Sequence, residues 1–133
     1  MRTIKFRAWH KKEKVMWKPR LIEVGKEKIA VYSCPIEGNV PHYPKECELM
    51  QFTGLQDKNG KDIYCGDIVK LKENEYYFER SGEVIFEEGT FKIKNVELWN
   101  DGTYNHYSLE ILDTEFCEII GNIHENKELI TNK

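Results

Sequence analysis

"QFTGLQDKNGKDIYCGDIVKL", residues 51–71, holds three glycines and three aspartates in twenty-one positions, and its interpretation decides the fold. Asn59-Gly60 is a strong turn signal, because both residue types tolerate a positive φ. Gly66-Asp67 stands directly before the apolar "IVKL", where an aspartate carboxylate can accept backbone N–H groups as the chain enters a strand. We therefore predict structural turns followed by a β-strand.

A calcium loop is the first alternative, since Asp57 and Asn59 stand two positions apart. An EF-hand loop also needs an oxygen ligand at its fifth position, a glycine at its sixth and a glutamate at its twelfth. These places hold Lys61, Asp62 and Ile68. The stretch is therefore not predicted to bind calcium.

Phosphate binding and nucleophilic catalysis are no better supported by the sequence than calcium binding. Gly54, Gly60 and Gly66 are six positions apart, without a G-K-[ST] motif or a following helix that would bind phosphate. A cysteine or serine nucleophile needs a neighbouring histidine. The histidines are scattered singly through the sequence, at His10, His42, His106 and His124. The sequence therefore predicts no enzyme and no cofactor.

The cysteines argue against zinc as well. Zinc sites usually take two ligands from one tight turn, which fixes half of the tetrahedron at a small entropic cost. No C-x-x-C pair occurs, and the four cysteines stand thirteen or more residues apart: Cys34, Cys47, Cys65 and Cys117. We expect free thiols, without metal and without disulfides.

Composition limits the class of protein. The chain has 133 residues, of which 40% are hydrophobic and 32% charged, typical of one soluble domain with an elaborated arm. Alanine occurs only twice, while valine, isoleucine and aromatic residues are plentiful, which favours strands over helices. No apolar run approaches the roughly 20 residues of a membrane helix, and the N-terminus lacks a signal core. We expect a cytoplasmic protein without membrane contact.

The N-terminal part predicts a β-rich arm. Residues 3–18 alternate as a β-hairpin, and residues 20–33 contain two more strands. Residues 34–47 hold three of the four prolines and form an irregular loop. This loop is the one candidate boundary, between an arm of residues 1–47 and a core of residues 48–133.

The core also consists of short strands between glycine-rich turns. The predicted strands are residues 48–53, 67–72, 82–98 (a hairpin turning at Glu88-Gly89), 106–112 and 115–123. Residues 125–131 are expected to form at most one short helix. No segment keeps a helical period over twelve residues. The fold class is therefore all-β, a barrel or a sandwich.

Four motifs together resemble the YopX family of small phage and prophage proteins. The stretch "LMQFTGLQDKNGKDIYCGDIVKL" is joined in this order by the opening "IKFRAW", the middle "GEVIFEEGTFKI" and the closing "EIIGNIHENKELI". The resemblance implies a β-rich protein whose C-terminal part is an SH3-like barrel, encoded on mobile elements and without recognised catalytic residues. Cys65 departs from the pattern, because a charged or polar residue is expected there.

An SH3-like barrel gives these residues structural roles. Gly66-Asp67 would enter the first barrel strand, and Gly82 would let the chain bend into the second. The side chains expected inside the barrel are Ile68, Leu71, Val84 and Phe86, and those expected outside are Lys70, Glu83 and Glu87. The residues expected to serve as structural turns are Gly54, Asn59, Gly60, Gly66, Asp67, Gly82, Gly121 and Asn122.

Charge is divided unevenly along the chain and suggests self-association. Residues 1–28 hold ten basic residues against three acids (+7), while residues 29–133 hold ten against twenty (−10). A basic arm and an acidic body can attract each other between subunits. We predict a homo-oligomer that also binds a host or phage protein. The expected contact residues are Lys5, Phe6, Arg7, Trp9, Lys11, Lys12 and Trp17.

Nucleic-acid binding is the alternative. Residues 2–20 interleave aromatic side chains with eight basic residues, a composition suited to stacking and phosphate contacts. The sequence pI of about 5.8 argues against it, since most of the surface would repel phosphates. Capture of a small nucleotide at a subunit interface is a further alternative that no motif singles out.

Overall fold

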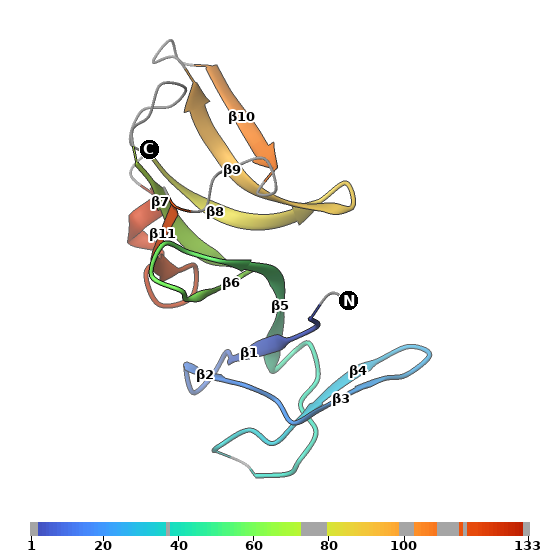
Figure 1. The fold of residues 1–133 in the computed structure, drawn as a ribbon. Helices are drawn as coiled ribbons and strands as arrows, with labels where there is room; N and C mark the ends of the chain where they lie inside the picture. Colours follow the sequence, from blue (N-terminus) through green and yellow to red (C-terminus); the bar gives the residue numbers. More distant parts are fainter. Residues whose placement is uncertain are drawn as a thin grey trace. The chain divides into compact units, whose positions relative to one another are not determined.

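A computed structural model describes residues 3–36, 38–72, 80–98, 103–108, 115 and 117–131 (Figure 1). The strands are β1 (Phe6–His10), β2 (Val15–Trp17), β3 (Leu21–Val24), β4 (Ile29–Tyr32), β5 (Cys47–Gln56), β6 (Asp62–Tyr64), β7 (Asp67–Leu71), β8 (Arg80–Glu87), β9 (Thr90–Leu98), β10 (Thr103–Ser108) and β11 (Cys117–Asn122). One short helix, α1, covers Glu128–Thr131. The prediction of a mainly β protein is confirmed.

The chain divides into two compact units, Thr3–Phe52 and Thr53–Lys133. Strand β5 is long and passes from the first unit into the second. The sequence prediction placed the border at the end of the proline-containing loop, where β5 begins. The observed division instead falls within β5, because the first half of this strand pairs with β1.

The first unit contains β1–β4 and the start of β5. β1 pairs with β2 on one side and β5 on the other, so Ala8 stands opposite both Trp17 and Leu49. β3 and β4 form a separate two-stranded sheet. The core of this unit consists of Ala8, Trp17, Val31, Cys34 and Cys47, with Leu49 packed against it. Residues from the loop after β4 thus help to bury the predicted N-terminal hairpin.

The second unit is built on a five-stranded antiparallel sheet in the order β10-β9-β8-β7-β11. The predicted β8–β9 hairpin is confirmed, with Glu87 and Thr90 as its last paired residues. The core consists of Ile63, Val69, Leu71, Val84, Phe91, Ile93 and Cys117. Apolar residues of neighbouring strands meet on one face, as the pairing of Val84 with Ile93 shows.

Three details differ from the sequence predictions. Residues 62–64 form the short strand β6 within a stretch that was predicted as turns. Phe86 was expected inside the barrel, but its side chain is 56% exposed. It shares a face with the buried Val84, but it lies next to the β8–β9 turn, where the core ends. The predicted strand 106–112 is observed as β10, and residues 109–112 lie outside the described residues.

Asp57 organises the first turn of the quoted stretch. Its Oδ1 accepts hydrogen bonds from the backbone N–H of Asn59 (2.9 Å) and Lys61 (3.0 Å). Its Oδ2 accepts one from Ile119 N (3.0 Å), sixty-two positions along the chain. Gly60 has a φ of 79°, whereas Asn59 has no positive φ. One carboxylate therefore shapes the turn and ties it to β11.

Gly66 and Asp67 form the second turn. Gly66 has a φ of 93°, its N–H donates to Val84 O (2.8 Å), and its carbonyl accepts from Ile123 N (2.9 Å). The Asp67 carboxylate is buried and accepts a hydrogen bond from Tyr64 N (2.8 Å). The turn thereby connects β7 to β8 and to the residue after β11. Its hydrogen bonds lie within the protein, which is what a structural role requires.

Valine at either turn glycine is expected to destabilise the protein. Gly60→Val and Gly66→Val should each lower the free energy of unfolding by about 1–3 kcal/mol, because a β-branched residue resists positive φ. Urea unfolding of the full chain measures this loss. Gly60→Asn is the matched control and should cost much less, since asparagine tolerates positive φ. A valine variant that keeps its stability would contradict the structural role.

Within the described residues, no helix is long and apolar enough to cross a membrane.

Candidate functional site

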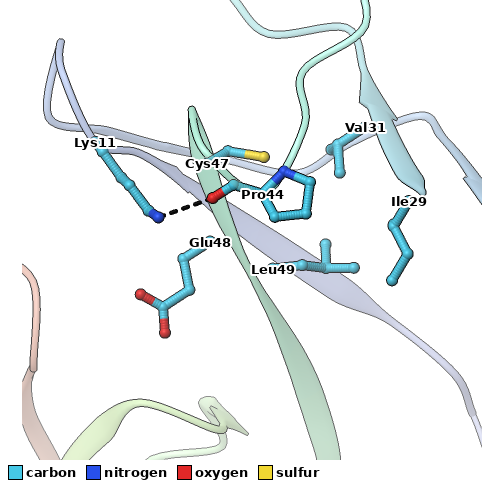
Figure 2. Close-up of a pocket in the computed structure, with 7 residues that line it drawn as sticks. All are labelled: Lys11, Ile29, Val31, Pro44, Cys47, Glu48 and Leu49. Carbon is cyan, nitrogen blue, oxygen red and sulfur yellow. Dashed lines mark hydrogen bonds between the residues drawn. The ribbon is translucent and has the colours of Figure 1, made fainter. Parts of the chain in front are cut away.

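An apolar hollow of about 240 Å³ lies on the first unit, between β4, β5 and the loops beside them (Figure 2). It is lined by Lys11, Ile29, Val31, Pro44, Cys47, Glu48 and Leu49. Cys47 and Leu49 share one face of β5, and Figure 2 shows the Glu48 carboxylate directed away from Ile29 and Val31. The inner wall of the hollow is therefore aliphatic.

The β3–β4 hairpin continues this wall outward. Its register pairs Ile22 with Val31 and Val24 with Ile29, so these four side chains share one face, here called the aliphatic face. Exposure rises along this face, from 1% at Val31 through 39% at Ile29 to 76% at Val24. An apolar surface thus extends from the buried core through the hollow into solvent. This exposed apolar surface makes the hairpin face a candidate contact site.

Lys11 forms the polar rim of the apolar hollow. Its Nζ donates a hydrogen bond to the Pro44 carbonyl (2.8 Å), and its backbone N–H donates to Glu46 O (2.9 Å). These two bonds hold the β1–β2 turn against the segment that precedes β5. The rim is therefore cationic and fixed in place.

A second, basic hollow of about 590 Å³ adjoins the first and shares Lys11 with it. Its lining consists of His10, Lys11, Lys12, Val40, Pro41, His42, Lys45 and Glu46. Three ammonium groups against one carboxylate give this surface an excess of positive charge. Neither Lys12 nor Lys45 forms an ion pair with another described residue. Their charges are available to an acidic partner.

An aromatic cluster lies beside the basic hollow. The ring of His42 packs edge-on against His10 (5.3 Å between centroids) and Trp17 (5.9 Å). His42 Nδ1 lies 3.1 Å from the Glu46 carboxylate. His10 Nδ1 accepts a hydrogen bond from Glu13 N (3.0 Å). Both imidazole rings are therefore buried and packed within the first unit.

The predicted contact residues divide into three groups by their exposure. Trp9 and Trp17 are only 7% and 6% exposed, so neither offers a free aromatic surface. Lys5, Phe6 and Arg7 are half-buried. Lys11 and Lys12 alone are exposed, and both line the hollows.

Other residues of the surface were not predicted from the sequence. Val24, Ile29 and Lys45 line or extend the hollows, although the sequence assigned them no contact. The sequence pattern around these residues could hardly reveal them. Alternation in a two-stranded hairpin does not show which of its two faces the rest of the unit covers.

Two of the cysteines, Cys47 and Cys117, are buried thiols with a raised pKa. None of the four cysteines forms a disulfide. Burial, followed by the Glu46 carboxylate, raises the pKa of Cys47. Burial raises the pKa of Cys117 to about 12, with smaller contributions from Asp57 and Asp67. A thiol of such high pKa remains protonated at neutral pH and is a poor nucleophile. Among the described residues, no three histidine, cysteine or acidic side chains gather as a metal site.

The predicted turn residues lie in the second unit and act through the backbone. Gly54, within β5, has a φ of 89°. Asn122 Oδ1 accepts hydrogen bonds from His124 N (3.0 Å) and Glu125 N (2.9 Å), which turns the chain after β11. A Cβ on Gly121 would stand 2.5 Å from the Asn126 side chain, so glycine leaves room for that turn.

One family model and two solved structures match this chain over nearly its whole length. The family model described as YopX protein matches residues 5–131. A solved structure of protein EF1440 from Enterococcus faecalis is 25% identical, with 97% of this chain and 99% of that chain covered and a TM-score of 0.57. The structure of protein yopX from Bacillus subtilis is 19% identical, with 98% and 99% covered and a TM-score of 0.63. No curated protein matches this chain.

Proposed function

Because the chain belongs to the YopX family, we propose that it is a phage or prophage protein without catalytic activity that serves as a binding and assembly module. It associates with copies of itself through the first unit and binds a host or phage protein in the cytoplasm of the bacterial host. In this proposal the second unit is an SH3-like barrel, and the first unit provides the binding surface.

The observation that supports this proposal is the adjoining pair of hollows on the first unit. The aliphatic face supplies apolar area that water covers in the isolated chain, with Val24 76% exposed. Beside it, Lys12 and Lys45 supply a cationic rim. An apolar centre with a charged edge is the usual anatomy of a protein–protein contact. Burial of the centre supplies affinity, and the lysines select an acidic partner.

The titratable groups of the surface fit a role in binding better than one in catalysis. His10 Nδ1 is occupied by a backbone N–H, and Cys47 has a raised pKa. A general base or a nucleophile needs a free lone pair aimed at a reacting group. These side chains instead stabilise the walls of the hollows.

Nucleic-acid binding is the second candidate, and the basic hollow favours it. Lys11, Lys12 and Lys45 converge there and can contact phosphates. The stacking partners predicted from the sequence, Trp9 and Trp17, are buried, so single-stranded bases lack these platforms. This makes the second candidate weaker than the first.

Light scattering and sedimentation of the full chain test the proposal. The wild-type protein is expected to self-associate, with weaker association at high salt. Val24→Asp should weaken association at least tenfold, because it places a charge on the aliphatic face. Leu21→Asp is the matched control. Leu21 is 54% exposed on the opposite face of the same hairpin, so this variant should behave like wild type.

A wild-type chain that stays monomeric at every concentration would refute self-association. Binding of single-stranded DNA that falls steeply with salt and is lost in Lys12→Glu would put nucleic-acid binding in its place.

A further inference from the structure

The β8–β9 turn presents an aromatic side chain to solvent. Glu88 and Gly89 have φ values of 53° and 78°, the positive pair of a two-residue type I′ turn. The Phe86 ring just before this turn packs edge-on against the buried Phe91, at 5.0 Å between centroids, and is still 56% exposed. Figure 1 shows the turn, in yellow, extending away from the rest of its sheet. The ring is therefore both exposed and held in position.

Two acidic residues, Glu87 and Glu88, follow Phe86 in the chain. The Lys92 ammonium lies 3.9 Å from the Glu87 carboxylate and 3.4 Å from that of Glu88. Two carboxylates thus share one ammonium, and the turn carries an excess of negative charge. Glu88 is the more accessible of the two, with 78% of its side chain exposed. Phe86 with Glu87 and Glu88 is called here the acidic tip.

The surface of the first unit is complementary to the acidic tip in both respects. The apolar hollow of about 240 Å³ is smaller than a typical drug-sized site and suits a single inserted side chain. The adjoining basic hollow offers Lys12 and Lys45 to nearby carboxylates. An exposed aromatic ring on an acidic turn matches an aliphatic wall that adjoins a basic hollow.

We propose that the acidic tip of a second copy is the occupant of the apolar hollow. The Phe86 ring of one copy packs on Val24, Ile29 and Leu49 of its neighbour, and its Glu88 pairs with Lys12 of the same neighbour. This inference rests on the proposed self-association and names the surfaces that carry it. Among the large apolar side chains described as exposed, Phe86 is the one aromatic. The division of charge, +7 in residues 1–28 against −10 in the rest, also favours a contact between the first unit of one copy and an acidic surface of another.

Such a contact joins two different patches and is heterologous. Because every copy carries both the tip and the hollow, such contacts build a ring, an open filament or a pair in which each tip enters the other hollow. A preorganised aromatic ring in a fitted hollow is the kind of residue that dominates interface energies, because little conformational entropy is lost when it binds. Phe86 should therefore contribute more to affinity than the surrounding charges.

Sedimentation equilibrium of the full-length variants tests the contact. Phe86→Ala should raise the dissociation constant of self-association by about 10- to 100-fold. Leu129→Ala removes another exposed apolar side chain of the second unit and should leave the constant unchanged. Thermal melting of each variant verifies that it is folded.

A charge exchange tests the pairing independently and touches only exposed side chains. Lys12→Glu and Glu88→Lys should each weaken association several-fold, because each places like charges opposite one another. The double variant restores opposite charges and should recover most of the lost affinity. Absence of this recovery would overturn the pairing.

The outcomes separate this inference from the proposed function. If Phe86→Ala associates like wild type while Val24→Asp does not, the aliphatic face has another occupant, and this inference is wrong although self-association holds. If the wild-type chain is a monomer, both are wrong.

Discussion

Replacing Asp57 with alanine is expected to lower the free energy of unfolding by about 3–5 kcal/mol. The carboxylate is 6% exposed and accepts hydrogen bonds from three backbone N–H groups, those of Asn59, Lys61 and Ile119. Hydrogen bonds to a charged group contribute roughly 1.5–3 kcal/mol each, and buried donors left without a partner add a desolvation cost. The bond to Ile119 also closes a long loop, so its loss should loosen the turn from β11.

Asp62→Ala is the matched control in the same stretch. Asp62 Oδ1 accepts a hydrogen bond from Gln56 Nε2 (3.1 Å) near the surface. The loss of such an exposed bond should cost less than about 1 kcal/mol. Guanidinium unfolding of both variants gives the comparison. Equal losses at the two positions would show that Asp57 does not organise the turn.

The same carboxylate predicts how stability depends on pH. Burial alone would raise the pKa of Asp57, but the N–H groups of Ile119, Lys61 and Asn59 outweigh it and hold the pKa below its ordinary value. A carboxyl group with a lowered pKa contributes stability that is fully present above its unfolded pKa of about 3.9 and is lost as pH falls through its folded value. The stability difference between wild type and Asp57→Ala should therefore shrink below about pH 4. A constant difference down to pH 2 would contradict this origin.

The strands were predictable where one face of the sequence alternates and a strong turn follows. Ile68 and Val84 are buried as expected, and Glu88-Gly89 forms the expected turn. The alternation also assigned Phe86 to the correct face. It could not show that the core ends before this residue, because that depends on which other strands cover the end of the hairpin. Alternation predicts the face of a strand, and only packing decides burial.

The candidate site was predictable only in its charges. Lys11 and Lys12 were expected at a contact surface, and both line the hollows. Trp17 was expected among the contact residues, and in the isolated chain His42 and Val31 from the segment after β3 help to bury it. These contacts join residues far apart in the sequence, with no local signal. The hollows form because the loop after β4 packs against the β1–β2 hairpin. The sequence has no periodic pattern from which this packing could be predicted.

Replacing Gly82 is expected to be, with the loss of Asp57, one of the two most damaging changes in the second unit. A Cβ at this position in β8 would stand 2.6 Å from Ile93 Cγ2 and 2.9 Å from the Lys94 carbonyl oxygen. Gly82 has no positive φ, so the cost is a steric clash without backbone strain. We expect Gly82→Val to lower the free energy of unfolding by about 3 kcal/mol or more, at the upper end for overpacking. Denaturant unfolding of the full chain measures this loss.

The two clashing atoms allow the cause to be separated. Ile93→Ala removes Cγ2 but leaves the Lys94 carbonyl in place, since that oxygen belongs to the backbone of β9. If the backbone contact dominates, Gly82→Ala should remain costly in the Ile93→Ala background, and a double-mutant cycle should show little rescue. Full rescue would mean that the side chain alone requires glycine here. β8 and β9 approach each other closely at this point, because glycine in β8 leaves room for the backbone of β9.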